Sequence, residues 1–315
     1  MASNASPFQT GGGGTNFEES VQTAFLITLI IQGEIPCIPS GKLSKIALQV
    51  ADRGYETDDL LAISKSNNGT HRLLVQVKFN ISFTLKNDIF KEVLTAFWKD
   101  YTNISIFDKT KDKLVIATSG LTKDERNHIK PLFNWAKNKA TEVDFFNEVN
   151  RIEAKKEKLN IFSSLLKEAN DNKDLTDKEI WEFLKCVDVL EYDFINEGSV
   201  DKTNFLNLIK LSKSKTSTAT ESETWDSVFS YISTLNKDGG SATLESIKDK
   251  DFFKHFDNVQ LSPYFKAVEK LKSDSKEILR PIKTSIGKDE NELQLPRIEV
   301  REKIVQAIST SQFTL

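Results

Sequence analysis

The sequence predicts an α/β protein in which a mixed sheet is flanked by helices and followed by an all-α region. Two observations predict this fold class. Before residue 140, apolar residues change several times between helical spacing and short strand-like runs. After residue 141, helical spacing dominates. A chain of 315 residues has room for two such parts, since single hydrophobic cores stop growing near about 250–300 residues.

The predicted α/β part begins with a buried helix. Residues 1–14 are polar and end in four glycines, which predicts a flexible N-terminus. Thr15 and Glu18 then have the spacing of a capping box, and a helix is expected over residues 17–32. Because residues 24–31 are apolar on nearly every face of that helix, we expect it to lie inside the domain.

The sheet is predicted from runs with strand character at residues 45–50, 58–64, 72–79 and 113–118. Turn-forming residues at 66–70 favour an antiparallel hairpin between the second and third runs. Amphipathic helices are expected over residues 87–101 and 124–137. The order of these elements is typical of a layered α/β domain.

The remainder of the chain is predicted to be helical. Helical spacing recurs over residues 143–158, 161–169, 177–190, 202–211, 224–235, 263–272 and 298–308. The predicted organisation is therefore a flexible N-terminus over 1–14, an α/β domain over 15–140 and a helical linker or oligomerisation region over 141–315.

Composition excludes several classes of protein. The chain carries 43 Lys and Arg against 46 Asp and Glu, which excludes a polybasic nucleic-acid binder. Two cysteines, Cys37 and Cys186, are too few for a disulfide framework or a cysteine zinc site. No segment reads as a signal peptide or a membrane span, so a cytoplasmic protein is expected.

Polar residues gather at the predicted hairpin. Gln76 and Lys78 alternate with apolar residues, so both side chains point to the same face of their strand. Asp58 and Asp59 open the neighbouring strand, and pairing of the two strands can bring Asp59 beside Gln76 and Lys78. Asp59 is preferred because it directly precedes the apolar run, whereas Asp58 suits a cap of the preceding turn. The sequence leaves the choice between them open.

These residue types suit a divalent cation and a phosphodiester. Mg²⁺ takes oxygen ligands, which Asp59, the Gln76 amide, the Val77 backbone carbonyl and Glu18 can supply, and Mn²⁺ is a substitute. The cation activates water, and Lys78 can position that water and stabilise negative charge in the transition state. Taken singly, each of these residues also has an ordinary structural explanation, as a solvated strand residue or part of a capping box.

The pattern resembles the PD-(D/E)xK nuclease superfamily in its Gln-x-Lys variant. The resemblance is carried by TDDLLAI at 57–63 and VQVK at 75–78, preceded by GGGGTNFE ending at Glu18. The combination is most similar to the nuclease effector domains of anti-phage STAND NTPases (the Avs class) and of CBASS endonucleases. It covers about residues 11–150 and implies a restriction-endonuclease-like sheet. Gln76 departs from the acidic residue that is usual in the superfamily.

The resemblance implies a function. It predicts a Mg²⁺-dependent endonuclease that cleaves double-stranded DNA, acts as a prokaryotic anti-phage effector and is activated by assembly into a homodimer or tetramer. Four basic residues flank the predicted cleft in sequence and are candidates for DNA phosphate contacts: Lys42, Lys45, Arg53 and Lys86. The alternative is a catalytically silent nuclease-fold module that binds DNA or protein partners.

The C-terminal segment carries a further expectation. Residues 295–315 resemble the helix that precedes the first strand and phosphate-binding loop of many STAND NTPases. No Walker motif follows this segment. We therefore expect the chain to be the N-terminal piece of a longer protein whose NTPase and sensor domains are absent from it.

Overall fold

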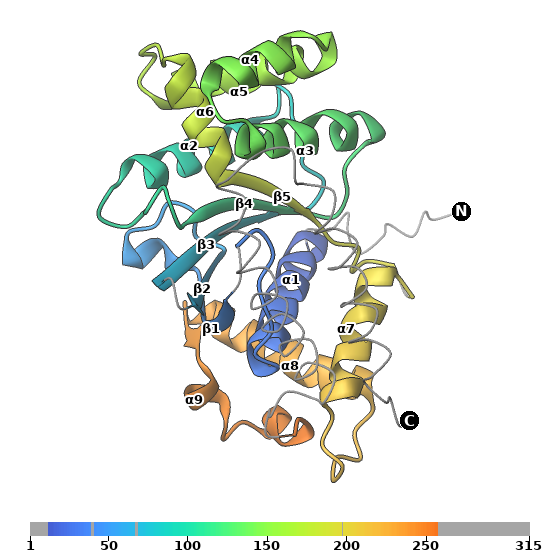
Figure 1. The fold of residues 1–315 in the computed structure, drawn as a ribbon. Helices are drawn as coiled ribbons and strands as arrows, with labels where there is room; N and C mark the ends of the chain where they lie inside the picture. The colour runs from blue at the N-terminus through green and yellow to red at the C-terminus, as the bar shows by residue number, and fades with distance from the viewer. Residues whose placement is uncertain (1–11, 39–40, 67–68, 197, 258–315) are drawn as a thin grey trace, which may run out of the picture. The chain divides into compact units, whose positions relative to one another are not determined.

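A six-stranded mixed sheet organises the chain (Figure 1). The computed structural model describes residues 12–38, 41–66, 69–196 and 198–257. The α/β fold class is confirmed. The helices predicted over 263–272 and 298–308, and the resemblance noted for 295–315, lie outside the described residues.

The strands follow the order β5-β4-β3-β2-β1-β6 across the sheet. Their bounds are β1 Lys42–Leu48, β2 Leu60–Ser66, β3 Gly69–Lys78, β4 Lys113–Thr118, β5 Val187–Glu191 and β6 Ser241–Ala242. Strands β3, β4 and β5 are parallel, while β2, β1 and β6 are added antiparallel. The predicted hairpin is confirmed, because β2 pairs with β3 and Leu60 faces Val75 in that pairing.

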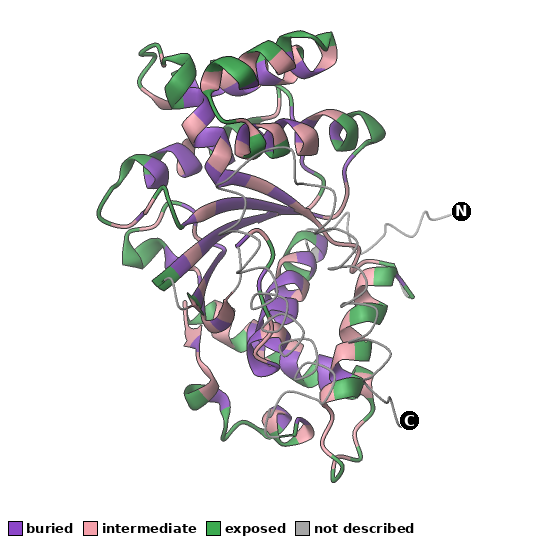
Figure 2. Ribbon diagram, in the orientation of Figure 1, coloured by how far each residue is buried: buried purple, intermediate pink, exposed green. Residues whose placement is uncertain are grey.

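Helices cover both faces of the sheet (Figure 1). One face carries α2 Asp88–Thr102, α3 Lys123–Asn138, α4 Glu142–Asn150, α5 Glu153–Ala169 and α6 Asp177–Cys186. The other face carries α1 Gly12–Ile30, α7 Val200–Ser212, α8 Glu221–Lys237 and the short α9 Leu244–Ile247. Two 3₁₀ turns complete the described chain, η2 Val50–Arg53 and η3 Asp251–His255. Each face has its own hydrophobic core, and most residues in the middle of the sheet are buried (Figure 2).

Helix α1 is buried, as its sequence predicts, but it begins earlier than expected. Gly12, Gly13 and Gly14 form its first turn, so the prediction of a flexible segment through residue 14 is wrong for these three residues. Thr15 consequently lies within the helix and does not cap it. This placement turns Glu18 toward the sheet instead of into a capping box.

The region after residue 141 is not all helical. Residues 187–190 were predicted to end a helix, but α6 ends at Cys186 and β5 begins at Val187. The alternation of Val187 and Val189 with polar residues favours a strand, and the partly buried edge beside β4 completes it. Because β5 and β6 both join the sheet, the predicted boundary near residue 140 does not divide the described structure.

Within the described part of the chain, no helix is both long enough and apolar enough to cross a membrane.

Candidate functional site

Asp59, Gln76 and Lys78 lie together at the start of β2 and the end of β3. One oxygen of Asp59, Oδ2, accepts hydrogen bonds from Gln76 Nε2 at 2.6 Å and from the Val77 backbone N–H at 2.7 Å. The Lys78 ammonium lies 3.5 Å from the same oxygen. Asp59 and Gln76 are each only 6% exposed, so this is a buried polar cluster at the ends of two central strands of the sheet.

The turn before Asp59 is held by helix α2. The Asp100 carboxylate accepts the backbone N–H of Glu56 at 2.9 Å and that of Thr57 at 2.8 Å. Asp100 is itself 1% exposed. This side chain therefore fixes the backbone two residues ahead of Asp59, so that the Asp59 side chain reaches the end of β3.

Helix α1 supplies a second carboxylate. Glu18 Oε1 accepts from Gln22 Nε2 at 2.9 Å, from Gln49 Nε2 at 2.9 Å and from Asn236 Nδ2 at 3.4 Å. Gln22 Nε2 also donates to the backbone carbonyl of Asp59 at 3.0 Å, which links the helix to the start of β2. Glu18 and Asp59 thus belong to one network.

Both carboxylates have one oxygen surrounded by donors and one that is not. All three donors to Glu18 reach Oε1, and all three donors to Asp59 reach Oδ2. No described residue donates a hydrogen bond to Glu18 Oε2 or Asp59 Oδ1. The amide groups orient the two carboxylates and leave an oxygen of each for a further partner.

The electrostatics of this cluster favour a cation. Burial, and then the neighbouring Asp59 carboxylate, raise the pKa of Glu18 from 4.5 to about 7. Burial also raises the pKa of Asp59, against the opposing effects of Lys78 and the Val77 N–H. A buried carboxylate and a half-buried one, with a single ammonium in contact with Asp59, carry excess negative charge, which a bound cation would neutralise.

The donor types fit Mg²⁺ or Mn²⁺. The described residues contain no group of three or more His, Cys, Asp and Glu side chains placed to hold a metal ion, so a cation here would depend on two carboxylates supplemented by neutral oxygens. One neutral oxygen is Gln22 Oε1. Gln22 is 0% exposed, and this oxygen has no hydrogen-bond partner among the described residues. An orphaned buried acceptor beside two carboxylates suits a site for a hard cation or its bound water.

The structure shows which of the other predicted ligand groups face this cluster. Asp59, not Asp58, contacts Gln76 and Lys78, whereas Asp58 accepts the Val50 N–H through its backbone carbonyl. Gln76 directs its amide nitrogen, not its carbonyl oxygen, at Asp59. Because the N–H and C=O of a strand residue point to the same side, the Val77 carbonyl faces the same edge as its N–H.

The predicted phosphate-binding residues do not converge on this cluster. Arg53 donates to the backbone carbonyl of Gly239 at 2.8 Å, Lys42 and Lys45 lie along β1, and Lys86 is exposed before α2. In the described structure, no contact joins any of these four residues to Asp59. Proximity in sequence was the only basis for their prediction, and the sheet directs them elsewhere.

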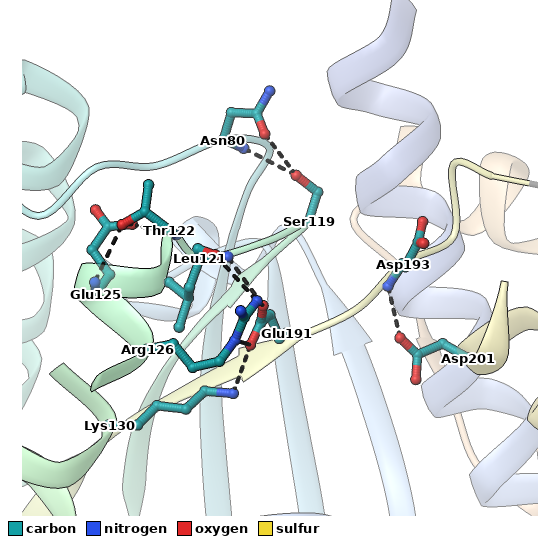
Figure 3. A network of polar contacts seen from close by, with 10 residues as sticks. All are labelled: Asn80, Ser119, Leu121, Thr122, Glu125, Arg126, Lys130, Glu191, Asp193 and Asp201. Carbon is teal, nitrogen blue, oxygen red and sulfur yellow. Dashed lines mark hydrogen bonds and ion pairs between the residues drawn. The ribbon is translucent and has the colours of Figure 1, made fainter. Parts of the chain in front are cut away.

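A second polar network closes the carboxyl ends of the parallel strands (Figure 3). Glu191, at the end of β5, accepts from Lys130 at 2.9 Å and from the Leu121 N–H at 3.1 Å, and it pairs with Arg126. Arg126 above all holds the pKa of Glu191 at about 2. Glu191 thus pairs with both of these basic side chains, whereas Lys78 pairs with Asp59.

Three residues of the site were missed by sequence reasoning. Gln22, Gln49 and Asn236 come from α1, the segment after β1 and the end of α8, and Asn236 lies 218 positions from Glu18. Lone amide residues carry no spacing signal. Gln22 is the exception, because it follows Glu18 by one helical turn and therefore lies on the same face of the helix.

Comparison with known proteins gives a limited set of similar structures. No protein-family model matches the sequence, and no curated protein matches it. The Acinetobacter baumannii Cap4 SAVED/CARF-domain containing receptor with the cyclic trinucleotide 3′3′3′-cAAA is similar at 12% identity and a TM-score of 0.42, over 76% of this chain and 46% of that one.

Two further solved structures give similar values. The same receptor with 2′3′3′-cAAA has 12% identity and a TM-score of 0.41, over 75% of this chain and 47% of that one. The Moraxella osloensis Cap4 SAVED/CARF-domain containing receptor has 14% identity and a TM-score of 0.40, over 76% and 49%. The chain therefore spans about half the length of the solved proteins that it matches.

These structures correct the predicted function. They are named as receptors, two of them with a cyclic trinucleotide, and none is named as a DNA nuclease. The prediction of an effector that cleaves double-stranded DNA is contradicted on this basis, and with it the double-stranded DNA partner.

Proposed function

We propose that Glu18, Asp59 and their amide partners bind a divalent cation, and that the resulting site hydrolyses a phosphodiester bond. The observation that carries this proposal is the pair formed by the buried Asp59 and the half-buried Glu18, whose carboxylates each have one oxygen with several donors and one without a described donor. A pair held half-saturated, with raised pKa values, is typical of a functional site.

The chain supplies oxygen ligands of the kind that Mg²⁺ prefers. Asp59 Oδ1 and Glu18 Oε2 would hold the cation, with the Val77 carbonyl and Gln22 Oε1 available directly or through water. When bound, Mg²⁺ lowers the pKa of water and stabilises charge on a phosphoryl oxygen. Gln22, Gln49 and Asn236 hold Glu18 in the orientation that this binding requires.

Lys78 has a separate role. Its ammonium, 3.5 Å from Asp59 Oδ2, can donate to a non-bridging oxygen of the phosphodiester and to the attacking water. Water adds to phosphorus, the bond from phosphorus to the ester oxygen breaks, and a proton goes to the departing oxygen. Lys78 stabilises the extra negative charge while these bonds change.

The proposal is tested with cation titration and with hydrolysis of bis(p-nitrophenyl) phosphate, a generic phosphodiester. Asp59→Asn is expected to weaken Mg²⁺ and Mn²⁺ binding at least 10-fold and to abolish hydrolysis, since it removes a charged ligand. Lys78→Ala is expected to retain cation binding, because it removes a repulsive charge, while hydrolysis falls about 10²–10³-fold. The cyclic trinucleotide 3′3′3′-cAAA serves as a second substrate.

Asp58→Asn is the matched control. It removes the neighbouring carboxylate, which does not contact Gln76 or Lys78, so cation binding and hydrolysis are expected to match the wild type. If Asp59→Asn binds Mn²⁺ as tightly as Asp58→Asn does, the cation site is not at Asp59. If both variants bind and hydrolyse as the wild type does, the proposal fails entirely.

The wider setting stays a prediction. Assembly into a homodimer or tetramer, an anti-phage role, a cytoplasmic location, the PD-(D/E)xK relationship and absent NTPase and sensor domains are expectations from the sequence that the described structure does not test.

A further inference from the structure

A cavity of about 340 Å³ lies between the start of α1, the segment after β5 and helices α7 and α8. Its size is within the range of pockets that bind small organic ligands. Phe17, Phe194, Phe229 and Trp225 contribute to its wall, together with Lys202 and Asp226. Four aromatic side chains and one cation give this wall a distinctive chemistry.

The aromatic side of the cavity is held in place. Phe194 packs against Trp225 with ring centroids 5.7 Å apart, and it stacks on Tyr192 at 5.2 Å with an interplanar angle of 13°. The segment that carries Phe194 is fixed to α7 by a hydrogen bond from the Asp193 N–H to Asp201 at 2.7 Å (Figure 3). Phe194 and Phe229 are nevertheless half-buried, so their rings retain surface for a ligand.

Lys202 is the unusual member of this wall. Its ammonium lies 3.5 Å from the centre of the Trp225 ring, and none of the ion pairs between described residues includes Lys202. Burial lowers the pKa of Lys202 to about 8, with Asp226 acting in the opposite direction. A half-buried ammonium without an anion is stabilised when a ligand supplies one.

We propose that this cavity binds a nucleotide, with the base against Phe194 and Phe229 and a phosphate at Lys202. Planar bases stack on aromatic side chains, and an ammonium is a common phosphate partner. Asp226 adds a carboxylate that can accept from a base amino group.

Helix α1 contributes to both the cavity and the cluster at Asp59, through Phe17 and Glu18 respectively. Phe17 lines the cavity and meets Phe79 edge to face at 5.8 Å, and Phe79 directly follows Lys78. Phe17 also directly precedes Glu18 in α1. Since consecutive side chains of a strand point to opposite faces, Phe79 and Lys78 face different sides of the sheet, and the nucleotide pocket is inferred independently of the proposed hydrolysis.

The test measures binding without hydrolysis, so that it is independent of the cation site. The full chain carrying Asp59→Asn is titrated in EDTA with adenosine 5′-monophosphate, adenosine and inorganic phosphate, using calorimetry and tryptophan fluorescence. The monophosphate is expected to bind at least 5-fold more tightly than either fragment. Lys202→Gln is expected to weaken monophosphate binding about 5–10-fold and to leave adenosine binding unchanged.

Two further variants make the result specific. Phe194→Ala is expected to weaken adenosine and the monophosphate equally, because it removes the stacking surface. Lys210→Gln, at an exposed position of the same helix, is expected to bind as the parent does. Absence of monophosphate binding at millimolar concentration, or equal affinity in the Lys202→Gln and Lys210→Gln variants, would overturn the nucleotide pocket while leaving the cation site at Asp59 standing.

Discussion

Replacing Glu18 by glutamine tests whether the Glu18 carboxylate carries a destabilising charge in the folded chain, and it needs no substrate. Glutamine has nearly the same shape, and its carbonyl oxygen can still accept the hydrogen bonds that reach Glu18 Oε1. The substitution therefore removes the negative charge while retaining the local packing. We expect Glu18→Gln to be more stable than the wild type above pH 7 in the absence of metal.

The magnitude follows from the raised pKa. Glu18 has a pKa of about 7 in the folded chain against 4.5 for the ordinary group, so between these values the folded chain holds a proton that the unfolded chain has released. Stability consequently falls as the pH rises through this interval, at up to about 1.4 kcal/mol per pH unit. At pH 8 the charged carboxylate costs about 2–3 kcal/mol, and at pH 4 it costs nothing.

The assay is urea denaturation of both proteins at pH 5 and pH 8, in EDTA and again in 10 mM Mg²⁺. In EDTA, Glu18→Gln is expected to exceed the wild type by about 2–3 kcal/mol at pH 8 and by less than about 1 kcal/mol at pH 5. With Mg²⁺ the wild type regains stability through binding, and the variant regains less. Glu92→Gln, at an exposed position of α2, is the control and is expected to change neither value by more than about 0.5 kcal/mol.

Equal stability of Glu18→Gln and wild type at pH 8 in EDTA would refute the reasoning, since it would mean that Glu18 is not buried against Asp59. A different outcome is that Glu18→Gln is more stable than the wild type in EDTA, but Mg²⁺ does not stabilise the wild type. It would confirm the buried charge and contradict the cation site.

Further predictions concern the residues that support the site. Asp100→Ala is expected to lose about 1–3 kcal/mol of stability by urea denaturation and to weaken Mg²⁺ binding in calorimetry, because two backbone donors ahead of Asp59 lose their acceptor. Asn236→Ala is expected to shift the pH midpoint of Mg²⁺ binding upward, since its hydrogen bond lowers the pKa of Glu18; an unchanged midpoint would exclude this role. In the wild type, Mg²⁺ affinity is expected to fall up to about tenfold per pH unit below pH 7 as the cation competes with the Glu18 proton. Asp112→Ala, which removes a buried acceptor of two backbone N–H groups and of Arg72, is expected to cost about 3 kcal/mol without changing Mg²⁺ affinity.

The sequence alone determined the local features of this protein. Alternation of side chains along a strand placed Gln76 and Lys78 on one face, and the turn at 66–70 paired their strand with the strand that follows Asp59. Asp59 was preferred over Asp58 because it adjoins the apolar run, and the structure brings Asp59 to Gln76. The buried character of α1 followed from apolar residues on nearly every face. Each of these inferences depends on neighbours a few residues away.

Only the tertiary structure decided which distant residues complete the site. Asn236 reaches Glu18 across 218 positions, β5 and β6 extend the sheet from a region that looks helical in sequence, and the wall of the aromatic cavity is assembled from α1, α7 and α8. A short segment with alternating apolar residues can form a helix or a strand, and it becomes a strand only when a neighbouring strand is available to pair with it. A single amide or lysine carries no periodicity at all, so its role is set by the groups that long-range packing brings within hydrogen-bond distance.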